Sequence, residues 1–197
     1  MTVAGGCAGA LIAGIALAGS PAAEACGYHD PTNVVRGMLN WVYPNALYVT
    51  TAVWTAQQEG ILARNEQPHA AQRLLGYQRT VAMLGTFRDR LTSTRDTKAA
   101  SGFSMVLIGP MLWSRYDVSE AAVSMTAHLV GPAKGDVVIV SDAPVIAGLL
   151  DGRLTPAEAR DLGLMRLYGP PERVQELTAW LDRLQVQSRA DASRIAP

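Results

Sequence analysis

The sequence predicts an α+β fold, in which an antiparallel sheet of about four strands is packed with helices and preceded by an N-terminal helical region. Three observations lead to this prediction. Between residues 31 and 95, apolar residues recur at helical spacing. From residue 102 to residue 140, the pattern is that of β-strands. Residues 135–184 then give a strand, a short helix, a shorter helix, a strand and a helix, each bounded by glycine or proline.

Residues 1–25 have the layout of a secretory signal peptide. An apolar core at residues 10–18 is followed by an A-x-A cleavage site at residues 23–25. The core has no Lys or Arg before it, and it is shorter than the ~20 residues that a membrane span needs. We therefore expect export rather than anchoring. The mature chain would begin at Cys26, have no membrane span, and be periplasmic or secreted.

The mature N-terminus carries three potential metal-binding side chains within five residues: Cys26, His29 and Asp30. A terminal amine, a thiolate and an imidazole could hold a soft or borderline ion, or serve a redox accessory role. The alternative is structural: Asp30 caps the next helix, Pro31 is its first residue, and His29 simply precedes it. Because no second His/Cys cluster completes a tetrahedral site, the prediction is no metal and no cofactor.

Three helices are expected before residue 100. The first runs from Pro31 to Tyr43 and stops before a proline, and the second covers Asn45–Glu59. The third, from His69 to about Arg95, is apolar on one side and rich in arginine on the other. That basic side could touch a membrane surface or an acidic partner, but a solvated face explains it as well.

Strands are expected after residue 102. Residues 102–116 form the first, which bends or lies at a sheet edge at Pro110. Residues 121–130 give the second, the valine-rich residues 137–140 the third, and residues 164–168 the fourth.

Capping residues mark the helices that accompany the last two strands. Asp142 can cap a helix that ends at Gly152. Residues 155–158 read Thr-Pro-Ala-Glu, a capping box that starts a helix ending at Gly163. Residues 171–184 carry the apolar stripe of a closing helix.

The spacing of Gly152, Pro156, Ala159, Gly163 and Gly169 resembles the C-terminal half of sterol carrier protein 2 (SCP2)-like domains. The resemblance extends over residues 135–184. It implies a sheet with helices packed on it that holds lipid-like or other apolar ligands between the two layers. It also implies one strand more than the four expected here.

Large apolar side chains on the expected strands and helices could line such a ligand cavity: Met105, Leu107, Met111, Trp113, Met125, Leu149, Leu150 and Met165. Burial of an acyl chain is worth ~0.8 kcal/mol per CH2, so apolar contact alone makes micromolar binding attainable. The alternative is that these residues fill a solid core, because protein interiors are close-packed.

The predicted function is therefore an exported binding protein for a lipid-like or other small apolar ligand. The alternative is a non-enzymatic accessory or interaction protein of the cell envelope, on the same scaffold without a ligand. No enzyme is predicted, because the sequence has no G-x-S-x-G, P-loop, dinucleotide-binding or H-E-x-x-H motif. Acidic residues such as Asp136 and Asp142 stand at turns and caps, where carboxylates serve structure.

Charge and length bound the remaining possibilities. Lys+Arg 17 and Asp+Glu 17 balance to a net charge of +0, which gives no electrostatic footprint for nucleic acid. The expected organisation is a signal peptide at residues 1–25, a helical region at residues 26–100 and an SCP2-like α+β region at residues 101–197. We expect residues 26–197 to form one domain.

Overall fold

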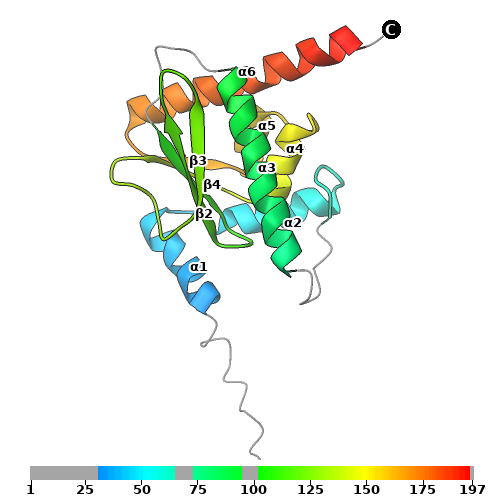
Figure 1. Cartoon of the computed structure of the whole chain (residues 1–197). Helices are drawn as coiled ribbons and strands as arrows, with labels where there is room; N and C mark the ends of the chain where they lie inside the picture. Colours follow the sequence, from blue (N-terminus) through cyan, green and yellow to red (C-terminus); the bar gives the residue numbers. More distant parts are fainter. Residues whose placement is uncertain (1–30, 65–72, 95–101, 196–197) are drawn as a thin grey trace, which may run out of the picture.

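The computed structural model describes residues 31–64, 73–94 and 102–195. The expected signal peptide and the Cys26–His29 segment lie outside these residues. Six helices and five strands follow one another along the described chain (Figure 1): α1 (Pro31–Val42), α2 (Tyr48–Gln58), α3 (Arg73–Ser93), β1 (Phe103–Leu107), β2 (Leu112–Val118), β3 (Val123–Leu129), β4 (Val137–Ser141), α4 (Ala143–Leu150), α5 (Pro156–Asp161), β5 (Arg166–Tyr168) and α6 (Pro171–Ile195). The α+β prediction is confirmed.

The five strands form one mixed sheet in the order β3-β2-β1-β4-β5. Three of its neighbouring pairs are antiparallel, and β1 with β4 is parallel. The prediction of about four strands was one short, because residues 102–116 do not form one bent strand. The chain reverses at residues 108–111, where Met111 N donates to Ile108 O at 3.3 Å. Pro110 therefore lies in a hairpin turn, which does not require the N–H that proline lacks.

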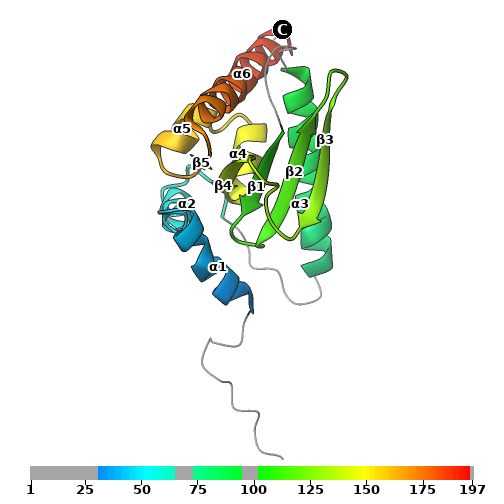
Figure 2. The same ribbon diagram turned by 90° about the vertical axis from the view of Figure 1, so that its left-hand side faces the viewer.

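One face of the sheet is covered by α3, α4 and α6, and the main core lies there (Figures 1 and 2). Its aromatic centre joins sheet and helices. The Phe103 ring stacks on Tyr116 with centroids 4.7 Å apart, and Trp180 of α6 meets Phe103 edge-on at 6.1 Å. Phe87 of α3 meets Tyr116 edge-on at 5.9 Å.

The opposite face of the sheet is held by α1 and the turn that follows it. The Tyr43 ring lies 6.3 Å from Trp113 of β2 and 5.2 Å from Tyr168 of β5, measured between centroids. Burial raises the pKa of both the Tyr43 and the Tyr168 phenol. Arg36 donates to Gly109 O at 2.9 Å, so α1 is also fixed to the β1–β2 turn.

The predicted helix signals are confirmed at the atomic level. The Asp142 carboxylate accepts from Ala143 N at 2.7 Å and so caps α4. The capping box is complete, since Glu158 N donates to the Thr155 hydroxyl and Thr155 N donates to the Glu158 carboxylate. Gly152 and Gly163 have φ of 71° and 70°, the left-handed conformation in which helices commonly end.

The turn at Gly109 gives a first prediction. A Cβ at this position would lie 2.8 Å from an Asp142 carboxylate oxygen, which also accepts from Gly109 N. Gly109→Ala therefore displaces the carboxylate that caps α4, and we expect it to lower the free energy of unfolding by about 1–2 kcal/mol. Urea unfolding followed by circular dichroism measures this. Gly85→Ala is the control, because Gly85 lies in α3 with open space around it. Equal stability of the two variants would contradict the steric argument.

The buried carboxyl of Asp142 gives a second prediction. Desolvation by burial raises its pKa, and hydrogen bonds from Ala143 and Gly109 with the Arg36 charge only partly offset this. The contribution of this group to stability is thus fully present below the ordinary aspartate pKa and is lost as pH rises through the raised value. Asp142→Asn keeps an acceptor oxygen but does not titrate. We expect the variant to gain stability relative to the unchanged protein as pH rises from about 3 to about 7.

Chemical unfolding of both proteins across that pH range tests the sign. Asp151→Asn, at an exposed surface carboxylate, serves as the control for a general charge effect. The assignment to Asp142 would be refuted if the free energy of unfolding of Asp142→Asn, minus that of the unchanged protein, stays constant or falls with rising pH.

Candidate functional site

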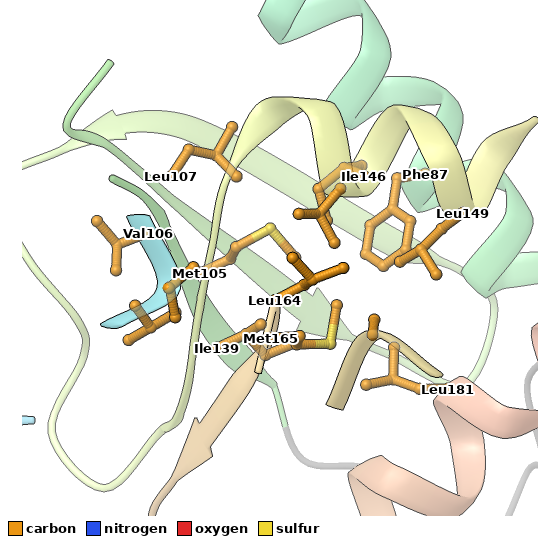
Figure 3. Close-up of a cluster of buried hydrophobic side chains, with 14 of the residues drawn as sticks. Phe87, Met105, Val106, Leu107, Ile139, Ile146, Leu149, Leu164, Met165 and Leu181 are labelled. Atoms are coloured by element: carbon orange, nitrogen blue, oxygen red, sulfur yellow. The ribbon is translucent and has the colours of Figure 1, made fainter. Parts of the chain in front are cut away.

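The structure separates the eight residues predicted to line a cavity. Four of them lie together in the core between the sheet and the helices, each at most 9% exposed (Figure 3): Met105, Leu107, Leu149 and Met165. Trp113 is buried on the opposite face of the sheet, against Tyr43. The others are partly buried and pack against the core: Met111, Met125 and Leu150. The role of these residues in ligand binding stays a prediction.

The described residues form an open groove at a different place in the molecule. A solvent-open groove of about 290 Å³ lies between α2 and the end of α5. It is lined by Tyr48, Thr51, Ala52, Thr55, Ala56, Glu59, Ile61 and Leu162. The lining is mostly apolar, and its polar side-chain groups are the hydroxyls of Tyr48, Thr51 and Thr55 and the carboxylate of Glu59.

The groove exists because small residues on α2 meet a single large residue after α5. Ala52 and Ala56 are one helical turn apart and leave room beside the helix axis. The buried face of α2, which includes Val49 and Val53, fixes the helix to the body of the molecule. Leu162 follows α5 as its C-cap and is 47% exposed, so it forms the facing wall.

Sequence reasoning did not find this groove, because its two walls are about a hundred residues apart in the chain. The helices themselves were predicted, but their docking was not. The signal that was available is the pair of alanines between larger apolar residues on a helix.

An arginine lies beside the groove. Arg166 of β5 approaches Gly163, where a Cβ would lie 3.8 Å from Arg166 Nη2 and 3.9 Å from the Ala52 methyl group. Its Nε is buried and has no hydrogen-bond partner. Arg160 of α5 makes a two-oxygen contact with Asp182 at 2.8 and 3.0 Å, and its Nη1 is likewise buried without a hydrogen-bond partner. Neither arginine is among the residues that line the groove.

The buried carboxylate of Asp136 is not a candidate for chemistry. It is 6% exposed and accepts from the Ser104 hydroxyl at 2.7 Å and from Arg115 Nε at 3.0 Å. Arg115 also pairs with Asp117 at 2.9 Å. These contacts join β1, β2 and the turn before β4, which agrees with a structural role.

Two further findings concern the parts of the chain that the structure describes. Within residues 31–64, 73–94 and 102–195, no group of three or more His, Cys, Asp or Glu side chains could hold a metal ion. In the same ranges, no helix combines the length and the apolar character required to cross a membrane.

Comparisons with known proteins return a likeness of fold. No protein-family model matches the chain, and no curated protein matches it in sequence. Among solved structures, it is similar to UbiJ-SCP2, a ubiquinone synthesis protein, at 16% identity and a TM-score of 0.41, over 56% of this chain and 98% of that one.

Two further solved structures have comparable scores. Palmitated SCP2L2 from Aedes aegypti matches at 15% identity and a TM-score of 0.38, over 50% of this chain and 90% of that one. The sec-alkylsulfatase Pisa1 from Pseudomonas sp. matches at 15% identity and a TM-score of 0.35, over 48% of this chain. The matched part is 14% of the sulfatase. Several of the solved structures similar to about half of this chain are thus SCP2 or SCP2-like proteins.

Proposed function

We propose that this protein binds a small apolar ligand in the groove between α2 and α5. The supporting observation is the groove itself, an open and largely apolar hollow of about 290 Å³. That volume is just below the range for ligand pockets, roughly 300–1,000 Å³, and suits a small ligand. The burial of an alkyl chain in this groove would contribute ~0.8 kcal/mol of binding free energy per buried CH2. The chain would lie along Ala52, Ala56, Ile61 and Leu162.

The groove is a better candidate than the predicted space between the sheet and the helices. Side chains such as Met105, Leu107 and Met165 lie within the core cluster there and are almost fully buried. A ligand among them would have to displace close-packed atoms, whereas a ligand in the groove displaces water.

We also propose that the chain is exported. This rests on the apolar core at residues 10–18 and the A-x-A site at residues 23–25. When the full chain is expressed in a bacterial host, we expect a periplasmic or secreted product whose N-terminal residue is Cys26. Intact-mass measurement of each cell fraction tests this. Leu11→Arg, which interrupts the core, should leave unprocessed protein inside the cells. If the unchanged chain reaches the periplasm or the medium without being cleaved, the proposal is contradicted.

One observation favours a second function, docking of a protein partner at the cell envelope. α1 presents an apolar face to solvent that comprises Met38, Trp41 and Val42, with Trp41 91% exposed. Native mass spectrometry of the purified mature protein distinguishes the two functions. A co-purifying small amphiphile supports ligand binding, whereas a bare chain that takes up no alkyl probe supports the accessory role.

Leu162→Asp tests the ligand proposal at the groove wall. A charged side chain there should lower the affinity for an uncharged fluorescent alkyl probe about tenfold, a loss of about 1.4 kcal/mol. Leu75→Asp is the matched control, because Leu75 on α3 is similarly exposed, at 51% against 47%, and does not line the groove. Titration of probe fluorescence measures both. An equal effect of the two substitutions would exclude the groove as the binding site.

A further inference from the structure

We propose that the ligand of the groove between α2 and α5 is an alkylammonium compound, and that the Glu59 carboxylate binds its cationic head group. The inference rests on the proposed function and adds the chemical class of the ligand. It comes from the charge of the lining residues, from the position of Glu59 at a helix end, and from hydroxyl groups beside it.

The first argument is the charge of the groove itself. Glu59 is the only charged side chain among the described residues that line it. Its carboxylate is exposed, and it forms no ion pair with any other described residue. A cationic head group is therefore attracted to this end of the groove, whereas an anionic head group is repelled.

The second argument is the position of Glu59 where α2 ends. Glu59 is the C-cap residue of this helix, and the last turn of the helix has no basic residue. A helix C-terminus carries the negative end of the helix dipole, so a carboxylate is unfavourable there and a cation is favourable. Arg64, which follows the helix, donates to Gln58 Oε1 at 3.3 Å and is not a lining residue. A cation from outside the chain would thus be stabilised both by the carboxylate and by the helix end.

The third argument is a row of hydroxyl groups that leads to the carboxylate. Thr51, Thr55 and Glu59 follow one another at intervals of four residues, so they share one side of α2. The hydroxyls of these two threonines make no hydrogen bond with the described residues, whereas Thr80 and Thr92 of α3 each donate to the carbonyl four residues before. An ammonium group has three donors and no acceptor. The Glu59 carboxylate and the Thr55 hydroxyl, one turn apart, can accept from two of them.

The apolar part of the lining orients such a ligand. The lining on α2 extends from Tyr48 to Glu59, about 16 Å at 1.5 Å per residue. Ala52 lies seven residues before Glu59, about 10 Å along the helix axis. Arg166 lies beside Ala52, outside the lining, and its charge disfavours a cation at that end. The head group would therefore lie at Glu59, and the alkyl chain would extend over Ala56 towards Ala52.

The test compares octylammonium, octanol and octanoate, which have alkyl chains of equal length, as competitors of the uncharged fluorescent probe on the mature chain at neutral pH. At low salt we expect octylammonium to bind about fivefold more tightly than octanol, which is the upper range for an exposed ion pair. Octanoate should bind more weakly than octanol. Because Glu59 is exposed, the preference for octylammonium should shrink as the salt concentration rises.

Two variants separate this inference from the proposed function. Glu59→Gln keeps an acceptor oxygen but removes the charge, so octylammonium and octanol should bind to it equally. Glu176→Gln removes an exposed carboxylate of α6 that does not line the groove, and should keep the preference. If the unchanged protein binds octylammonium no better than octanol or octanoate, or if the preference persists in Glu59→Gln, the role of Glu59 is overturned and apolar binding stands. If neither the probe nor any of the three ligands binds, both proposals are wrong.

Discussion

The contacts of the Asp142 carboxylate hold together three parts of the chain that are distant in sequence. It caps α4 through Ala143 N and accepts from Gly109 N in the β1–β2 turn. Gly109 O in turn accepts from Arg36 of α1. Next to it, Ile108 N donates to Ser141 O at 2.9 Å and continues the parallel pairing of β1 and β4 by one residue. Desolvation outweighs these hydrogen bonds and raises the pKa of the carboxyl, but the same contacts position a hairpin, a helix and the N-terminal region together.

These contacts also explain which parts of the fold could be predicted. Caps and helix ends depend on neighbouring residues, so Asp142, Thr155, Gly152 and Gly163 were interpreted correctly from the sequence. The pairing of β1 with β4 depends on residues about thirty positions apart. A run such as 102–116 can be one bent strand or two strands of a hairpin. In the hairpin, Gly109 N donates to the Asp142 carboxylate, a residue about thirty positions away that no local pattern links to the turn.

The groove is harder to predict from local sequence patterns than the helix caps are. Its α2 wall is placed by aromatic contacts of the preceding turn, where Tyr43 touches Tyr168 and the Tyr168 hydroxyl donates to Pro44 O at 2.7 Å. The far end of α2 is placed by Leu62, which approaches Gly148 of α4 so closely that a Cβ there would lie 3.1 Å away. Both contacts join the N-terminal region to the C-terminal half, so no single stretch of sequence contains the site.

The eight residues chosen for a cavity show why apolar size is an unreliable indicator of a ligand site. Large flexible side chains fill space, and the most buried of them, such as Met105 and Leu107, are part of the core. An open site is instead formed where small side chains stand opposite a wall that is held from elsewhere, as Ala52 and Ala56 stand opposite Leu162.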